Sequence, residues 1–312
     1  MKRVEFGRYG GPATMRVGEC DVPQAGPGQV QVKVMAAAIN PLDWKQRQGA
    51  MKLMMSRRFP KGMGSDFAGI VTAVGESVLA FKPGDEVFGT MDVKQPGAFS
   101  EMLVTDSKLV VKKPPELSFA EAACLPIPCT TAWAAVLGKA PIARGAHVLI
   151  NGCTGSVGSM AVQLAKLNGA FVVGTCSASS MESARRAGVD LPVDYSDESA
   201  WTHAGPFDLI FDTAGTLDVG QALRVVKPTG KFIDINPTPR RLLQGVMSRK
   251  YKMVFATMAL DRLSDIARLA AEGPLKPVIG LTRPMSDAVN TIADIEGGHR
   301  RVSGKVVLLN GH

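Results

Sequence analysis

The sequence lacks the features of membrane and secreted proteins. None of its 312 residues lie in an apolar run near the roughly 18 residues that a membrane-spanning helix needs. The first residues, MKRVEFGRYGGPATMRV, alternate apolar and polar side chains and contain no apolar core of the secretory type. Hydrophobic residues nevertheless make up 46% of the chain, which argues against disorder. We therefore expect a globular, cytoplasmic protein of about two domains.

Cysteine and histidine are also scarce. The five cysteines are scattered and contain no CxxC pair, which excludes a disulfide framework and a zinc knuckle. We interpret all five as reduced thiols: Cys20, Cys124, Cys129, Cys153 and Cys176. The four histidines do not cluster with a Cys or Ser nucleophile, so no catalytic role is assigned to them.

Basic residues exceed acidic ones, and the excess is local. The chain has 36 Lys and Arg against 28 Asp and Glu, a net charge of +8. Such a charge is compatible with nucleic acid as a partner, but the basic residues are not interleaved with aromatic ones, as single-strand binding would require. Two acid-free segments hold eleven of the basic residues: Lys45, Arg47, Lys52, Arg57, Arg58 and Lys61, then Arg240, Arg241, Arg249, Lys250 and Lys252. They are either two solvated loops or a site that attracts an anionic substrate, such as a thioester of an acidic carrier.

The hydrophobic pattern divides the chain into regions of different structure. Short alternating segments broken by Gly and Pro, at 30–39, 67–75, 84–90 and 99–104, predict a β-rich, barrel-like unit. After about residue 120, continuous apolar runs at 147–150, 171–176, 207–215 and 231–235 alternate with helical patterns. This alternation is typical of a doubly wound parallel sheet, so the predicted class is α/β. Two helical stretches and a closing strand, GKVVLLN, follow.

The strongest single motif is NGCTGSVGSMAVQLAK at 151–166, directly after the strand HVLI. Gly152, Gly155 and Gly158 fall where a strand must turn tightly into a helix whose first amides face a pyrophosphate. Cys153 stands where the plain GxGxxG fingerprint has its first glycine. The strand–turn–helix context favours dinucleotide binding over an ordinary glycine-rich loop.

The end of the second strand bears on which dinucleotide is bound. The run GTCSASS, residues 174–180, has hydroxyl groups and no acid until Glu182. A carboxylate there would bind the ribose 2′-hydroxyl of NAD and repel a 2′-phosphate, so its absence favours NADPH over NADH. Arg185 and Arg186 follow a helical turn later and either pair with the phosphate or stay solvated.

Eight blocks carry a resemblance to a known family. They are NPLDWKQRQG (40–49), GSDFAGIVTAVGESVLAFKPGDEVFG (64–89), GAFSEMLV (97–104), LSFAEAACLPIPCTTAWAAV (117–136), NGCTGSVGSMAVQLAK (151–166), FDLIFDTAG (207–215), LRVVKPTGKFIDI (223–235) and GKVVLL (304–309). In this order they resemble the zinc-independent quinone oxidoreductase branch of the medium-chain dehydrogenase/reductase (MDR) superfamily. The resemblance implies a GroES-like catalytic β-barrel domain at 1–119 and 259–312, and a Rossmann NADP(H)-binding domain at 120–258.

The resemblance also implies that zinc is not needed. The zinc-dependent relatives have a cysteine where this chain has Asn40 and a histidine where it has Ser65. Their four-cysteine lobe has no counterpart between residues 90 and 105. Without thiolate and imidazole ligands, a tetrahedral Zn²⁺ site is not expected.

Site residues carry over from the family one position at a time. Asn40 resembles the asparagine on the nicotinamide side, Thr131 the threonine near the carboxamide, and Tyr195 the tyrosine that approaches the 2′-phosphate. Each also has a structural interpretation: Asn40 begins a turn, Thr131 caps a helix, and Tyr195 covers a sheet end. The full expected cofactor set is Asn40, Thr131, Gly152, Thr154, Gly155, Ser156, Val157, Gly158, Ser177, Ser179, Tyr195, Thr213 and Asn236. Ala178 and Ser179 stand where the family often has Lys or Arg, which leaves NADH open.

The resemblance implies hydride transfer to an electron-poor acceptor, a quinone or an α,β-unsaturated carbonyl. The candidate donors to a developing enolate oxygen are Asn40, Lys45 and Tyr9, with water as an alternative. Asp43 either orients Lys45 or caps the following helical turn. The rival function is a non-catalytic member of the fold that binds RNA or another acidic partner through its basic faces.

A homodimer is also expected. The segment KMVFATMAL at 252–260 is apolar and reads as an unblocked edge strand of the dinucleotide sheet. The resemblance implies that such an edge pairs with a second copy across a two-fold axis.

Overall fold

The computed structural model describes residues 1–139, 141–255, 260–300 and 302–311. The chain forms two compact units. Unit 1 comprises Met1–Ile127, Leu263–Ala271 and Val278–His312, and unit 2 comprises Pro128–Arg262 and Glu272–Pro277. Both units contain a β-sheet with its own hydrophobic core, so each is described separately.

Unit 1 is built around the long strand β3 (Gln29–Ala38). Val30, Val32 and Val34 alternate with polar residues and are fully buried, as expected for β-branched side chains on the covered face of a strand. Strand β3 pairs antiparallel with three others: β5 (Asp66–Val74), β7 (Met102–Asp106) and β16 (Lys305–Leu309). The sheet order is β15-β16-β3-β5-β6-β8, completed by β15 (Ile279–Pro284), β6 (Glu86–Thr90) and β8 (Val110–Lys112).

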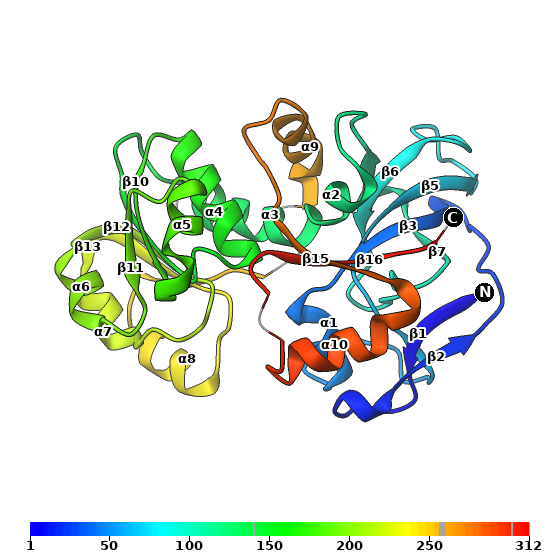
Figure 1. The fold of residues 1–312 in the computed structure, drawn as a ribbon, viewed down its shortest axis with the longest axis horizontal. Coiled ribbons are helices and arrows are strands. Elements are labelled where there is room, and N and C mark those ends of the chain that lie inside the picture. The colour runs from blue at the N-terminus through cyan, green and yellow to red at the C-terminus, as the bar shows by residue number, and fades with distance from the viewer. Residues whose placement is uncertain (140, 256–259, 301, 312) are drawn as a thin grey trace. The chain divides into compact units, whose positions relative to one another are not determined.

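A smaller sheet and four helices complete unit 1. The sheet has the order β2-β1-β4, with β1 (Lys2–Phe6), β2 (Met15–Glu19) and β4 (Lys61–Gly62). The helices are α1 (Pro41–Arg47), α2 (Phe119–Ala123), α9 (Leu263–Ala271) and α10 (Ala288–Glu296). Helix α10 lies beside α1, and Ala288, Thr291 and Ile292 form its buried face (Figure 1).

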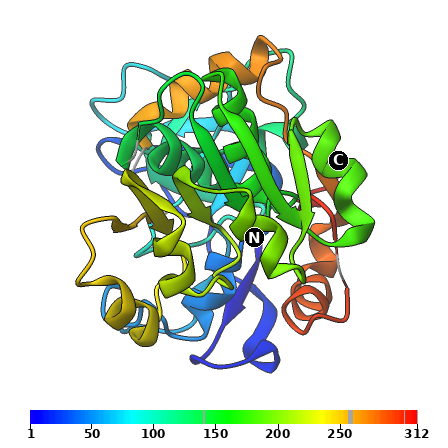
Figure 2. The same cartoon turned by 90° about the vertical axis from the view of Figure 1, so that its left-hand side faces the viewer.

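Unit 2 contains a six-stranded parallel sheet with the order β11-β10-β9-β12-β13-β14. This is the doubly wound arrangement of dinucleotide-binding sheets, with the strand order reversing at β9. The strands are β9 (His147–Asn151), β10 (Phe171–Cys176), β11 (Leu191–Asp194), β12 (Phe207–Asp212), β13 (Val226–Asp234) and β14 (Tyr251–Met253). Figure 2 shows these strands side by side, coloured from green to yellow.

Helices lie on both faces of this sheet. Helices α4 (Ser156–Leu167) and α5 (Met181–Arg186) lie on one face, and α6 (Glu198–His203) and α7 (Val219–Arg224) lie on the other (Figure 1). Helix α8 (Pro239–Gly245) connects β13 to β14, and α3 (Pro126–Trp133) precedes the sheet. Single 3₁₀ turns cover Pro12–Thr14, Ser107–Leu109, Ala178–Ser180, Leu260–Arg262 and Met285–Asp287, and a π-helical turn covers Ala134–Lys139.

The α/β class is confirmed, and the limits of the two compact units differ from those of the expected domains. The first boundary lies after Ile127 rather than after residue 119, because α2 packs on β3 and β5 of unit 1. The second lies after Arg262, and the expected position at 258–259 falls outside the described residues. Residues 272–277 belong to unit 2. Among the described residues, no helix is long and apolar enough to cross a membrane.

Candidate functional site

The glycine-rich turn of unit 2 connects β9 to α4. Gly152 has a φ of +78°, a conformation that side chains disfavour, and Cys153 N–H donates to the carbonyl oxygen of Thr175 at 3.0 Å. A Cβ on Gly158 would lie 2.1 Å from the carbonyl oxygen of Gly152, so the backbones of the turn and the helix are in direct contact. Both glycines are therefore required by the local geometry.

Helix α4 begins at this turn. Its N-cap is Gly155, an exposed residue with ordinary extended dihedrals. Helix N-termini have amides without intrahelical partners, and the first amides here belong to Ser156, Val157 and Gly158. Together with Thr154, which lies in the turn, they form an arrangement that fits a pyrophosphate.

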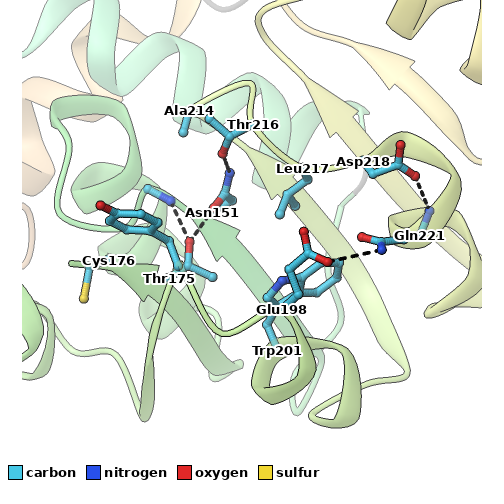
Figure 3. Close-up of a pocket in the computed structure, with 12 residues that line it drawn as sticks. Asn151, Thr175, Cys176, Glu198, Trp201, Ala214, Thr216, Leu217, Asp218 and Gln221 are labelled. Atoms are coloured by element: carbon cyan, nitrogen blue, oxygen red, sulfur yellow. Dashed lines mark hydrogen bonds between the residues drawn. The ribbon is translucent and has the colours of Figure 1, made fainter. Parts of the chain in front are cut away.

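A pocket of about 320 Å³ lies next to the turn, at the carboxyl ends of the parallel strands (Figure 3). Its walls come from the ends of β9 and β10, from α6 and α7, and from the loop after β12. The lining residues are Asn151, Gly152, Thr175, Cys176, Tyr195, Glu198, Trp201, Ala214, Thr216, Leu217, Asp218 and Gln221. The crevice where the strand order reverses is the usual ligand site of such sheets.

Asn151 joins three walls of this pocket. Its Nδ2 donates to Oδ1 of Asp212 at 2.7 Å and to Oγ1 of Thr216 at 2.9 Å, while its Oδ1 accepts from the Thr175 hydroxyl. Asn151 and Asp212 are almost fully buried. Figure 3 shows Asn151 between Thr175 and Thr216. The strand ends and the β12 loop are thus held as one hydrogen-bonded body.

The opposite wall has an unused hydrogen-bond acceptor. Gln221 Nε2 donates to Oε2 of Glu198 at 3.3 Å, beside the buried Trp201 ring (Figure 3). The Gln221 Oε1 atom is buried and has no hydrogen-bond partner within the part of the chain that the structure describes. A buried polar atom without a partner is unfavourable unless a ligand supplies one.

The loop after β10 brings Ser177 and Ser179 together. The Ser177 Oγ atom lies 3.1 Å from Oγ of Ser179 and 2.9 Å from Oγ of Ser180. Sequence reasoning missed Asp194, which pairs with Cys176 in the register of β10 and β11. Its side chain accepts from the Ser196 hydroxyl at 2.6 Å, which holds the pKa of this carboxyl below its usual range. An ionised acid therefore lies beside the serine-rich loop.

Three further predicted cofactor residues lie near the turn. Thr213 Oγ1 donates to the Asn151 carbonyl oxygen at 2.6 Å, and Asn236 Nδ2 donates to the Thr213 carbonyl oxygen at 3.2 Å. Tyr195 lines the pocket and is 58% exposed. Thr131 lies apart on α3, and its hydroxyl is buried without a partner among the described residues.

In unit 1, Asn40 is buried and both ends of its amide are engaged. Its Nδ2 donates to Oδ2 of Asp66 at 3.0 Å, and its Oδ1 accepts from Nζ of Lys305 at 2.5 Å. The buried positions of Asp66 and Lys305 were not apparent from the sequence, although both lie in blocks of the family resemblance. Burial raises the pKa of Asp66 to about 6, although the nearby Lys305 ammonium opposes the rise.

The structure brings Asp43 into contact with Asn40. One oxygen of the Asp43 carboxyl accepts from the Asn40 backbone N–H at 2.7 Å, and the other accepts from the Ser65 hydroxyl at 2.7 Å. The first bond caps α1, so the structural interpretation of Asp43 holds. Burial raises the pKa of Asp43 to about 7, against the opposing effect of these hydrogen bonds.

Tyr9 and Lys45, the remaining catalytic candidates, are both half-buried. The Tyr9 ring packs edge-on against Phe59, with centroids 5.2 Å apart, and lies over Gly49 just beyond α1. Lys45 lies on α1 itself.

The two acid-free segments are not uniformly solvated. Arg47 is fully buried and pairs with Glu296. Lys61 is also buried, and its ammonium donates hydrogen bonds to the carbonyl oxygens of Ser56 and Arg58. Arg241 is buried between Asp212, which is 29 residues away in the sequence, and Asp234, which is seven residues away. Three of the eleven basic residues are therefore structural, whereas Arg57 and Arg58 are exposed.

Within the described ranges, no group of three or more His, Cys, Asp or Glu side chains is arranged to hold a metal ion.

Comparisons with known proteins agree with these features. Residues 26–115 match the family model of the alcohol dehydrogenase GroES-like domain, and residues 187–308 match that of the zinc-binding dehydrogenases. The chain is 33% identical over 324 residues to a chloroplastic quinone oxidoreductase, QR1, of Triphysaria versicolor, covering 99% of this chain and 98% of the relative. It is 32% identical over 319 residues to a chloroplastic NADPH-dependent alkenal/one oxidoreductase of Arabidopsis thaliana, covering 99% of this chain and 79% of the relative.

A solved structure of the quinone oxidoreductase from Coxiella burnetii superimposes with a TM-score of 0.91 at 28% identity, covering 100% of this chain and 99% of that one.

Proposed function

Because this chain belongs to the quinone oxidoreductase branch of the medium-chain dehydrogenase/reductase superfamily, and is thus an oxidoreductase of the quinone or enone type, we propose that it is an NADPH-dependent, zinc-independent reductase. Its acceptor is a quinone or an α,β-unsaturated carbonyl compound. The observation that carries the proposal is the Gly152–Gly158 backbone contact at the start of α4, next to the pocket at the strand ends.

The residues of unit 2 fit a dinucleotide. The amides of Ser156, Val157 and Gly158 would hold its pyrophosphate, and the pocket beside Asn151 and Gln221 would hold its adenosine. The unpartnered Gln221 Oε1 atom supports this assignment, because an adenine amino group is a suitable donor. When bound, the cofactor supplies a hydride from its nicotinamide ring.

NADPH is proposed over NADH because hydroxyl groups, and no carboxylate, end β10. The clustered Ser177 and Ser179 hydroxyls are suitable donors to a 2′-phosphate. Asp194 opposes this preference through its negative charge, so the preference for NADPH is expected to be moderate.

Zinc independence is proposed from the chemistry of unit 1. The pair Asn40 and Ser65 replaces the thiolate and imidazole expected of the zinc-dependent relatives, and the buried Lys305 ammonium donates to Asn40. A dication next to this ammonium would be repelled in a medium of low polarity.

The acceptor's oxygen needs hydrogen-bond donors as negative charge develops on it. Lys45 and Tyr9 are proposed for this role, with water as the alternative donor. Asn40 is assigned to organising the start of α1, because its amide already bonds Asp66 and Lys305. The exposed Arg57 and Arg58 support an anionic acceptor, such as an acidic thioester.

A homodimer is proposed as well. Strand β14 ends the order of the parallel sheet and pairs only with β13 among the described strands. An unpaired edge of this kind can accept a strand from a second copy. Part of the predicted edge segment, residues 256–259, lies outside the described residues. A light-scattering mass of one chain at micromolar concentration would contradict the dimer.

The function is tested with purified protein, NADPH or NADH, and a panel of quinones, neutral 2-enals and acryloyl-type thioesters. We expect cofactor oxidation with at least one acceptor, a higher kcat/KM with NADPH than with NADH, and no loss after treatment with a zinc chelator. Absence of both cofactor oxidation and an NADPH-induced rise in Tm would favour the non-catalytic alternative. The hypothesis of an anionic acceptor has its own test. It would be contradicted if kcat/KM were equal for thioesters and enals and did not change in the Arg57→Glu/Arg58→Glu variant.

A further inference from the structure

We propose that Arg241 is a positioning residue for the cofactor pocket: its guanidinium fixes the loop 213–217 after β12, and thereby sets how tightly unit 2 binds the adenosine half of a dinucleotide. The proposal rests on the proposed function, because it assumes that the pocket takes a dinucleotide.

The guanidinium contacts the middle and the end of the loop. Its Nη1 atom donates to the carbonyl oxygens of Gly215 at 3.0 Å and Leu217 at 2.8 Å. Its Nη2 donates to Oδ2 of Asp212 at 2.7 Å, and its Nε donates to Oδ2 of Asp234 at 2.7 Å. Four hydrogen bonds from one rigid planar group therefore link α8, the end of β12, the end of β13 and the loop.

Asp212 holds the same loop through its amides. Its Oδ1 accepts from Gly215 N–H at 2.7 Å, and its Oδ2 accepts from Leu217 N–H at 3.1 Å. Gly215 and Leu217 are thus bound through N–H by Asp212 and through C=O by Arg241. This pairing leaves the loop little freedom to move away from the strand ends.

The charged groups of the clamp are buried and paired with one another. Asp212 and Asp234 are fully buried and Arg241 is 8% exposed. Burial acts to lower the pKa of Arg241, but its hydrogen bonds to Asp234 and Asp212 prevail and raise that pKa above its ordinary value. Tyr251 donates to Asp234 at 2.9 Å, and burial together with this bond raises the pKa of the phenol. The Arg241 guanidinium therefore keeps its proton near neutral pH.

The clamped loop forms one wall of the pocket. Ala214, Thr216 and Leu217 line it, and Thr216 accepts from Asn151 on the facing strand end (Figure 3). Release of the Gly215 and Leu217 carbonyls would therefore change the pocket wall itself, while leaving the glycine turn at Gly152 intact. The expected effect is weaker binding of the cofactor, with little change in the rate once the cofactor is bound.

The test compares Arg241→Lys with Arg240→Lys. Lysine keeps the charge but has a single nitrogen, which cannot reach two carboxylates and two carbonyls together. Arg240 precedes it on α8 and is exposed, so its variant is a matched control. Kd is measured by calorimetry with NADPH and with nicotinamide mononucleotide, and kcat is measured at saturating NADPH.

For Arg241→Lys we expect Kd for NADPH to rise at least tenfold, Kd for nicotinamide mononucleotide to stay unchanged, and kcat to stay within twofold of the parent value. Arg240→Lys should match the parent in all three. A lower Tm with an unchanged Kd for NADPH would show that Arg241 only stabilises the fold, and would overturn the proposal. A parent protein that binds no NADPH would instead contradict the proposed function.

If Arg241→Lys does not fold, Asp234→Asn is used, because it is isosteric and removes the charge that holds the guanidinium in register with the loop carbonyls. A threefold or greater rise in Kd for NADPH, accompanied by faster hydrogen exchange at Gly215 and Leu217, would support the clamp. An unchanged Kd would overturn it.

Discussion

The Ser65 hydroxyl donates to one oxygen of the Asp43 carboxyl at 2.7 Å, in a part of unit 1 where Asp43 is only 1% exposed. The second carboxyl nearby, that of Asp66, is fully buried as well. Two buried acids therefore lie near the Lys305 ammonium, and for each carboxyl the effect of burial on the pKa outweighs the attraction of that ammonium.

This arrangement predicts that raising the pH destabilises the protein. Burial raises the pKa of Asp43 from 3.8 to about 7, so between these values the folded state binds a proton that the unfolded state has lost. The free energy of unfolding should fall as pH rises through this interval, by up to about 4 kcal/mol from this group, and level off above pH 7. Urea unfolding at several pH values measures it.

Asp43→Asn supplies the control. The amide keeps an acceptor for Asn40 N–H and has no proton to lose, so the variant should show a flatter profile between pH 4 and pH 7. Its remaining slope should come largely from Asp66, whose pKa is raised to about 6. A slope identical to that of the parent would refute the assignment to Asp43.

The glycine turn predicts losses of stability of different size for two neighbouring substitutions. A Cβ at residue 158 would lie 2.1 Å from the Gly152 carbonyl oxygen, whereas one at residue 155 would lie 3.3 Å from the same atom. Gly158→Ala should therefore lower the free energy of unfolding by about 3 kcal/mol or more, and Gly155→Ala by about 1 kcal/mol or less. Equal losses in thermal unfolding would be inconsistent with the observed backbone contact.

The ion pair of Arg47 and Glu296 predicts that removing Glu296 lowers the stability of the protein strongly. Arg47 is 0% exposed, and its guanidinium contacts Glu296 and the Gly10 carbonyl oxygen. Glu296→Ala should destabilise the protein by about 3 kcal/mol, because it leaves a buried cation without its carboxylate.

Gln48→Ala is the matched control for this pair. The exposed Gln48 donates to the other oxygen of Glu296 at 2.7 Å, so its loss should lower the free energy of unfolding by less than about 1 kcal/mol. If the two variants unfolded at the same denaturant concentration, the ion pair would have no special part in stability.

The acid beside the serine-rich loop predicts a shift in cofactor preference. Asp194→Asn removes a negative charge near Ser177 and Ser179 but keeps an acceptor for Ser196. Kd for NADPH should fall about two- to fivefold, more at low than at high ionic strength, and Kd for NADH should stay constant. Asp197→Asn, an exposed N-cap of α6, should leave both unchanged. A parallel fall in both Kd values would argue against repulsion of the 2′-phosphate.

Local sequence signals were sufficient to predict those parts of the fold and the site that consist of contiguous residues. The strand HVLI, the glycine turn and α4 appear as predicted, because tight backbone contact admits only glycine at Gly152 and Gly158. The parallel order of the sheet follows from the alternation of apolar runs and helices, and is confirmed.

Contacts between residues far apart in the sequence could not be predicted from such local signals. The run of basic residues near Arg241 contains no acid, yet Arg241 pairs with Asp212, 29 residues away, which the fold brings to the same sheet edge as Asp234. Asn40 pairs with Asp66 and Lys305, which lie 26 and 265 residues away from it in the sequence. Asp194 ends β11, and its place beside the end of β10 follows only from the pairing of the two strands.

The most direct test of the account is isotope transfer from NADPH deuterated at C4, with each stereoisomer supplied separately, to a 2-enal. We predict that one of the two isomers gives a saturated product with a single deuterium on its β-carbon, detected by mass spectrometry and NMR. Formation of no reduced product with any acceptor in the panel, or a product that lacks the deuterium with both isomers, would contradict hydride transfer from a bound nicotinamide.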